Sequence, residues 1–124
     1  MIFLIALGGA LGSAARYYVM SLVSHGFGKN FPYGTLCVNI LGSFIMGVMI
    51  VAFARLLSVS QPVQAMLTVG FLGGFTTFST FSLDTIVLIE RGDISSAIIY
   101  VLLSVTGSLL GVALGLTISR MVMA

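Results

Sequence analysis

The sequence predicts an all-α integral membrane protein with four transmembrane helices and a break in the third. Of its 124 residues, 59% are hydrophobic and 6% are charged, whereas soluble domains carry about a quarter charged residues. The chain also divides into four apolar stretches, each of about the ~20 residues that a spanning helix requires. Glycine is common, with 15 residues, and Trp is absent. Small residues suit helices that pack closely in a membrane.

The predicted spans cover about residues 2–24, 34–57, 62–89 and 95–122, and together they form a single four-helix transmembrane domain over residues 1–124. Short connections join them, so no soluble domain is expected. A cleaved signal peptide is not expected either, because the first apolar stretch lacks a basic start and is interrupted by Arg16.

The first span carries one charge, Arg16, which follows a glycine-rich segment and precedes Tyr17 and Tyr18. A long basic side chain in a span usually reaches for the lipid–water interface. It can also line an aqueous vestibule and attract anions. We expect Arg16 to do both, at the membrane boundary and facing a vestibule.

The second span contains Asn39 in an apolar setting, two residues after the only cysteine, Cys37. A buried Asn needs hydrogen-bond partners, so a bond to another helix is one interpretation. Its amide also has two donors, which can serve a passing anion. The residues alone leave both interpretations open. The single cysteine excludes an intrachain disulfide.

The third span holds the segment Gly70–Ser82, in which the adjacent glycines Gly73 and Gly74 precede a dense run of Ser and Thr. A glycine in a helix interior costs about 1 kcal/mol relative to Ala, so the sequence predicts a helix break near Gly73–Thr76. Unwound backbone at membrane depth needs protein or a water-filled cavity around it. Two such breaks that meet on the axis of an antiparallel dimer suit a small cation such as Na⁺. A kink that only aids packing is the alternative.

Hydroxyl groups and phenylalanines alternate around this break. The hydroxyl side chains are Thr76, Thr77, Ser79, Thr80 and Ser82, and the aromatic ones are Phe75, Phe78 and Phe81. Each feature alone has an ordinary explanation, in hydrogen bonds back to the helix or in core packing. Together, hydroxyl donors and the positive edges of aromatic rings can coordinate a dehydrated anion weakly, and conduction requires weak sites. These hydroxyl groups, Thr80 among them, and the neighbouring rings are therefore candidates for an anion pathway.

The fourth span presents Tyr100, Ser104 and Ser108 at a spacing of four, which puts them on one helical face. This polar track is a further candidate for the anion path, and a helix-packing stripe explains it almost as well. In the third span, Asp84 is expected to make a structural contact or to lie near an entrance, because a carboxylate repels anions. Glycines at positions 107, 111 and 115 predict close helix packing on another face.

The distribution of basic residues is balanced. Four spans put both termini on one side of the membrane, together with Arg55 and Arg120, while Lys29 and Arg91 lie on the other side. Orientation normally follows an excess of Lys and Arg in the cytoplasmic loops. The balance favours insertion in both orientations and an antiparallel homodimer. A single orientation, set by other features of insertion, remains open.

These segments resemble the Fluc fluoride channels of bacteria and archaea, also called CrcB proteins. The resemblance covers the whole chain and rests on Gly8–Tyr17, on Gly34–Gly42 and above all on Gly70–Ser82, with its Gly-Gly-Phe-Thr-Thr-Phe-Ser-Thr-Phe core. It implies a dual-topology antiparallel homodimer with two pores in the cytoplasmic (inner) membrane of a prokaryote. The implied function is passive, fluoride-selective export down the electrochemical gradient, which gives fluoride resistance.

The resemblance also implies roles for single residues. Phe78 and Phe81 resemble the paired phenylalanines whose ring edges face fluoride, Asn39 resembles the pore asparagine, and Arg16 resembles the vestibule arginine. Other pore-side polar positions of the family match Thr35, Tyr100, Ser104 and Ser108.

For the third-span backbone, the resemblance implies that the carbonyl groups of Gly73 and Thr76 hold a central structural Na⁺. The expected partners are a second copy of the chain, fluoride and the lipid bilayer. No organic cofactor and no nucleic acid are expected.

Two other function classes fit these residues less well. A dual-topology, proton-coupled exporter of the small multidrug transporter type needs a titratable carboxylate near the membrane midplane. Here the first span carries Arg16, and Asp84 lies toward the end of its span. An enzyme is not expected, because His25 is the only histidine and the chain has no nucleophile–base pair, metal-ligand cluster or nucleotide loop.

Overall fold

The computed structural model describes residues 1–124, and the chain is helical throughout. The helices in order are α1 (Ile2–Phe27), α2 (Tyr33–Arg55), α3 (Gln61–Ala65), the π-helical segment η1 (Met66–Leu72), α4 (Gly73–Phe75), α5 (Phe78–Glu90) and α6 (Ile94–Val122). Four helical stretches are long and apolar enough to cross a membrane, namely Ile2–Phe27, Tyr33–Arg55, Gln61–Glu90 and Ile94–Val122. The protein is therefore an all-helical, multi-pass membrane protein.

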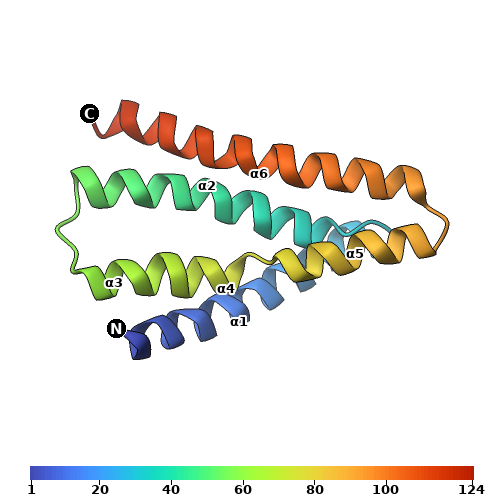
Figure 1. The fold of residues 1–124 in the computed structure, drawn as a ribbon, viewed down its shortest axis with the longest axis horizontal. Coiled ribbons are helices and arrows are strands. Elements are labelled where there is room, and N and C mark those ends of the chain that lie inside the picture. Colours follow the sequence, from blue (N-terminus) through green and yellow to red (C-terminus); the bar gives the residue numbers. More distant parts are fainter.

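The four stretches run back and forth along one long axis (Figure 1). Both termini lie at the same end of the molecule as the α2–α3 connection, and the α5–α6 connection lies at the opposite end. Helix α2 packs against both α6 and α1, while α1 also packs along η1 and α4. The interrupted third stretch is therefore held against α1 and α2.

Glycines allow the helix backbones to touch, as the small-residue spacing predicts. A Cβ at Gly111 of α6 would lie 3.1 Å from the carbonyl oxygen of Ile40 in α2. A Cβ at Gly70 of η1 would lie 2.6 Å from the carbonyl oxygen of Ile5 in α1. Larger side chains at these positions would separate the helices.

The third stretch leaves helical geometry at two threonines. Thr76 has φ −90° and ψ 161°, and Thr77 has φ −153° and ψ 119°, both extended. Gly73 remains helical at φ −61° and ψ −36°. The sequence placed the interruption near Gly73–Thr76, so the extended residues lie at and beyond the end of that segment.

Close packing against α1 explains why position 74 carries a glycine. A Cβ at Gly74 would lie 2.7 Å from the carbonyl oxygen of Gly9 in α1. This glycine is thus required for close approach of α1 rather than for an unusual backbone conformation. The β-branched threonines that follow accept extended geometry readily.

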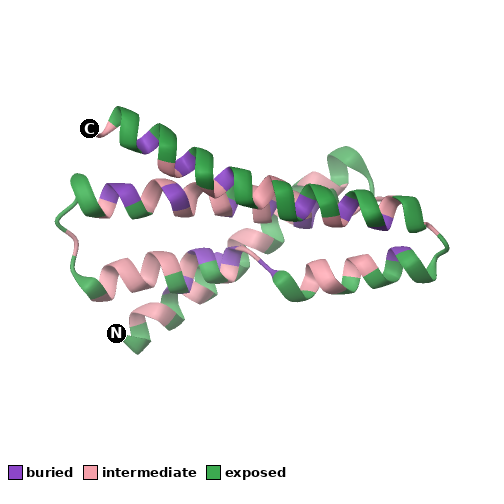
Figure 2. Ribbon diagram, turned by 45° about the horizontal axis from the view of Figure 1, so that its top comes forward, coloured by how far each residue is buried: buried purple, intermediate pink, exposed green.

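Most large apolar side chains point outward. Only 20 of the 124 residues are buried, and they lie along the inward faces of the helices, while exposed residues cover the outer faces (Figure 2). A small core cluster of Leu88, Ala97 and Tyr100 joins α5 to α6. An apolar exterior of this kind is stable in a bilayer and not in water.

Candidate ion pathway beside the interrupted helix

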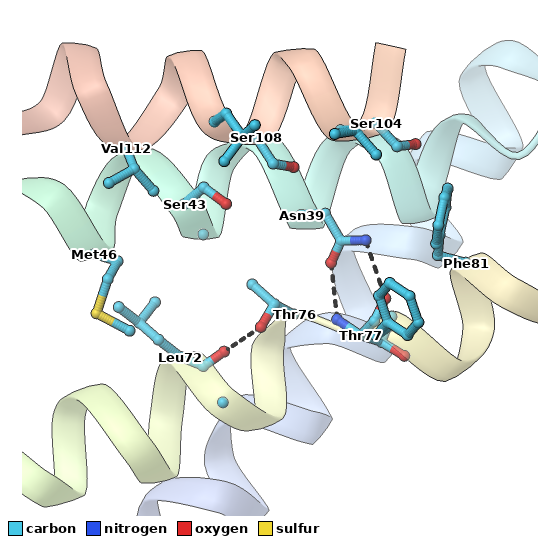
Figure 3. Close-up of a pocket in the computed structure, with 15 residues that line it drawn as sticks. Asn39, Ser43, Met46, Leu72, Thr76, Thr77, Phe81, Ser104, Ser108 and Val112 are labelled. Carbon is cyan, nitrogen blue, oxygen red and sulfur yellow. Dashed lines mark hydrogen bonds between the residues drawn. The ribbon is translucent and has the colours of Figure 1, made fainter. Parts of the chain in front are cut away.

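A partly open cavity of about 400 Å³ lies where the interrupted third stretch faces α2 and α6 (Figure 3). Its polar lining consists of hydroxyl groups, one side-chain amide and backbone groups, and no charged side chain lines it. The lining residues are Asn39, Gly42, Ser43, Met46, Leu72, Gly73, Thr76, Thr77, Phe78, Phe81, Ser104, Val105, Ser108, Leu109 and Val112.

Asn39 of α2 holds the interruption in place. Its Oδ1 accepts a hydrogen bond of 2.8 Å from the Thr77 amide N–H, and its Nδ2 donates one of 3.0 Å to the Thr77 carbonyl (Figure 3). The amide therefore satisfies both backbone groups of one extended residue. Because Nδ2 has two protons, one donor is left over beside the cavity.

The interruption removes the helical donors of the carbonyl groups of residues 73–76, and of these residues Gly73 and Thr76 line the cavity. In a continuous helix, the Thr77 amide would bond to the carbonyl of Gly73, but it bonds to Asn39 instead. Likewise, the Thr80 amide would bond to the carbonyl of Thr76, but it bonds to Thr77 Oγ1 at 3.1 Å. The carbonyl oxygens of Gly73 and Thr76 are hard ligands of the kind that Na⁺ and similar cations take.

The side chains of Thr76 and Thr77 make different hydrogen bonds. Thr76 Oγ1 donates to the Leu72 carbonyl at 2.8 Å, which ties it to the preceding helix. Thr77 Oγ1 caps the first turn of α5 through the Thr80 amide, a usual role for Thr at the start of a helix. The sequence analysis did not predict this cap, although a Thr directly before the first residue of a helix is the ordinary signal for it.

The phenylalanine repeat divides between core and cavity. Phe75 is buried and stacks on Phe71, with ring centroids 6.1 Å apart. Phe78 and Phe81 line the cavity, with centroids 5.5 Å apart and ring planes inclined by 54°. Phe78 is 77% exposed, so most of its ring is free to meet an ion or another molecule.

Helix α6 supplies hydroxyl groups to the other wall. Ser104 and Ser108 both line the cavity (Figure 3). Ser104 is buried, and its Oγ has no hydrogen-bond partner. Buried polar atoms nearly always have partners, so an unpaired one points to a ligand or water. Ser43 of α2 also lines the cavity.

The polar track of α6 continues from the cavity into the core through Tyr100. The Tyr100 ring lies against Phe81, with centroids 5.3 Å apart. Its hydroxyl donates to Asp84 Oδ2 at 2.9 Å, and Thr35, which is buried, lies close to the same hydroxyl. Asp84 therefore makes the structural contact that was one of its two predicted roles.

Four candidate residues lie outside the cavity lining. Arg16 is half-buried in α1 and makes no hydrogen bond or ion pair within the chain. Thr80 is half-buried in α5 and contributes its backbone amide to the cap at Thr77. Tyr100 and Thr35 likewise lie beside the cavity rather than in its wall.

The chain is similar to known proteins over a range that includes every residue of this site. The family described as CrcB-like protein, Camphor Resistance (CrcB), matches residues 3–116. The chain is 48% identical over 122 residues to the fluoride-specific ion channel FluC of Chelativorans sp. (strain BNC1), across 98% of each chain. It is 48% identical over 118 residues to the protein of the same name from Rhizobium etli (strain CIAT 652), across 95% of this chain and 94% of the relative. The similarly named protein of Magnetococcus marinus is 46% identical over 118 residues, across 95% and 96% of the two chains.

Proposed function

This chain belongs to the CrcB family, and from that premise we propose that it is a fluoride-specific ion channel which exports fluoride passively. The observation that carries the proposal is the 48% identity to a fluoride-specific channel over 98% of both chains. The protein is a channel and not an enzyme.

The composition of the cavity suits weak binding of a small anion. Hydroxyl groups, an amide donor and aromatic ring edges line it, without a fixed positive charge. Conduction needs sites that bind strongly enough for entry and weakly enough for release. A fixed Arg or Lys in the wall would slow release, because an ion pair is much stronger where water is excluded.

The pathway proposed for fluoride runs along the α6 track and past the phenylalanines. The free donors beside it are the Ser104 hydroxyl, the Ser108 hydroxyl and the second N–H of the Asn39 amide. Phe78 and Phe81 offer their positive ring edges. Fluoride is small and accepts strong hydrogen bonds. Hydrogen-bond donors in a narrow passage therefore replace the hydration shell of fluoride better than they replace the hydration shell of chloride.

Tyr100, Thr35 and Thr80 are assigned to the continuation of this pathway beyond Phe81. Arg16 is assigned to a vestibule, where its unpaired guanidinium attracts anions without holding them inside the passage. The protein is assigned to the cytoplasmic membrane of a prokaryote. There, fluoride that entered as HF and ionised in the cytoplasm is driven out by the membrane potential.

A second subunit in the opposite orientation is proposed to complete the cavity. Phe78 is largely exposed in the single chain, and the cavity is open on one side. Arg55 donates to the Arg120 carbonyl at 3.0 Å, so these two cations share one end of the molecule. Arg91 donates to the Asn30 carbonyl at 2.6 Å, next to Lys29, at the other end. Equal numbers of basic residues at both ends permit insertion in either orientation and support a dual-topology antiparallel homodimer.

A structural Na⁺ is proposed at the axis of this dimer, held by the carbonyl oxygens of Gly73 and Thr76. The fit rests on these two carbonyls, which lack their helical donors and line the cavity. Bound there, the ion supplies positive charge that offsets the carbonyl dipoles of two interruptions. The side chains of Asn39 and Thr77 keep these two oxygens free. They accept hydrogen bonds from the Thr77 and Thr80 amides, which would otherwise donate to the carbonyls of Gly73 and Thr76.

Growth of a bacterium that lacks its own fluoride exporter tests the function in cells. Expression of this chain is expected to restore growth in acidic medium that contains fluoride. Phe78→Ile is expected to abolish the rescue at equal membrane abundance, whereas Leu102→Ile, on the exposed face of α6, keeps it. Failure of the wild-type chain to rescue growth despite normal abundance contradicts the proposed function.

A further inference from the structure

A second hollow of about 580 Å³, here called the α1/α6 groove, lies on another side of the molecule. Its walls are almost entirely apolar and include Val23 and Phe27 of α1, Cys37 and Phe44 of α2, and Leu110 and Leu114 of α6. None of these residues lines the cavity beside the interrupted third stretch, which is called the ion cavity below.

The groove and the ion cavity lie on nearly opposite faces of α2. Asn39 and Gly42 face the cavity, while Cys37, Ile40 and Phe44 face the groove. At 3.6 residues per turn, the two sets point roughly 150° apart around the helix. A subunit that closes the cavity therefore leaves the groove open toward lipid.

The groove exists because two helices share α2 without packing on each other. Helices α1 and α6 both pack against α2, and contact between α1 and α6 is marginal at most. The floor on α6 is formed by Gly107 and Gly111, which bring that helix close to Ile40. A Cβ at Gly107 would lie 2.6 Å from Ile40 Cδ1, and one at Gly111 would lie 3.1 Å from the Ile40 carbonyl oxygen. Because glycine has no side chain, the space between the walls is not filled at these two positions.

The chemistry of the groove selects an apolar occupant. Water in a buried site needs two to four polar partners, and these walls offer almost none. Along α2, the groove extends from Tyr33 to Phe44, which is about 16 Å at 1.5 Å per residue. That length is about half the ~30 Å hydrocarbon core of a bilayer, so the groove matches the chains of one leaflet.

A basic side chain without an ion pair lies near one end of the groove. Phe27 and Tyr33 line the groove and flank the α1–α2 connection, which contains Lys29. Lys29 is exposed and makes no ion pair within the chain. A basic side chain at this level of the membrane attracts lipid phosphate. We propose that the α1/α6 groove binds one acyl chain of a phospholipid, with the lipid phosphate at Lys29. This proposal does not depend on which ion the channel conducts.

Lipid retention by the purified full-length protein tests the proposal. The protein is reconstituted with phosphatidylglycerol, extracted into detergent, and examined by native mass spectrometry. We expect the wild type to retain a phospholipid, and Leu110→Trp, which fills the groove, to lose it. Leu102→Trp is the matched control, because Leu102 is also exposed on α6 but lines neither hollow; it is expected to retain the lipid. Lys29→Gln is expected to weaken retention about fivefold through loss of the phosphate contact.

Three outcomes overturn the proposal. The first is a wild type that retains no phospholipid, and the second is equal retention by Leu110→Trp and Leu102→Trp. The third is dissociation of the oligomer by Leu110→Trp with lipid retention unchanged, since the groove would then be a contact with a second copy. Leu41→Trp, on the α2 wall of the groove, repeats the test if Leu110→Trp does not fold.

Discussion

Asn39 and Thr77 are joined by two hydrogen bonds, in which the side-chain amide of one residue pairs with both backbone groups of the other. Helix α2 thereby replaces the missing turn of helix in the third stretch. Of the two interpretations that the sequence left open for Asn39, the hydrogen bond to another span is confirmed. Donation to a passing anion stays a prediction, for which one N–H of the amide is left beside the cavity.

Asn39→Ala is expected to destabilise the protein by about 2 kcal/mol, because it leaves the amide and the carbonyl of Thr77 without partners. It is also expected to reduce fluoride flux, since the remaining donor is lost and the interruption loses its support. Thermal unfolding in detergent and flux in liposomes measure the two effects. Ser43→Ala, in the same cavity wall, is the control for stability, and an equal melting temperature in both variants contradicts the assigned role of Asn39.

Ser104→Ala separates conduction from stability. The Ser104 hydroxyl has no partner within the chain, so its removal breaks no internal hydrogen bond and is expected to leave the melting temperature unchanged or slightly raised. Fluoride flux is expected to fall about tenfold, which corresponds to the loss of one hydrogen bond to an ion. Ser82→Ala, whose hydroxyl is bonded to the Phe78 carbonyl, provides the comparison. Unchanged flux in Ser104→Ala removes this serine from the pathway.

Tyr100→Phe is expected to cost about 1–3 kcal/mol of stability, because it removes the hydroxyl that donates to the half-buried Asp84 carboxylate. Combination with Asp84→Asn identifies the interaction, since the two effects should not add if the residues act on each other. Additive changes in the melting temperature would instead assign Asp84 to a different partner.

The Na⁺ site proposed at the dimer axis predicts that removal of Na⁺ lowers the melting temperature of the protein. A ligand present at 100 times its dissociation constant stabilises the state that binds it by about 2.7 kcal/mol. The measurement compares unfolding in Na⁺ with unfolding in N-methyl-D-glucamine at equal ionic strength. The dependence is expected to weaken in Asn39→Ala, because the interruption that leaves the Gly73 carbonyl without its helical donor loses the two hydrogen bonds that hold it in place. Identical melting curves in the two cations contradict a bound Na⁺.

Much of the architecture could be predicted because apolar length alone defines a membrane span. Each predicted span overlaps one of the four long helical stretches. The ends differ by a few residues where apolar side chains continue into a connection, as at Phe27, which extends α1 beyond the predicted end.

The site was less accessible from the sequence, because its geometry depends on contacts between distant residues. The two glycines indicated an interruption, but Gly73 is helical, Gly74 serves close contact with α1, and the extended residues are the two threonines that follow. The Phe repeat gave no sign that Phe75 packs inward while Phe78 points out. The pairings of Asn39 with Thr77, 38 residues away, and of Tyr100 with Asp84 arise only in the folded chain.

Fluoride efflux from liposomes tests the central claim most directly. The protein is reconstituted into vesicles loaded with potassium fluoride, and release is followed with a fluoride electrode before and after addition of valinomycin. A passive fluoride channel gives fast efflux that requires the potassium pathway, and vesicles loaded with chloride show none. Slow efflux that needs a proton gradient and does not respond to valinomycin would contradict passive conduction and favour a coupled exporter. The absence of fluoride release from a folded dimer would contradict fluoride transport altogether.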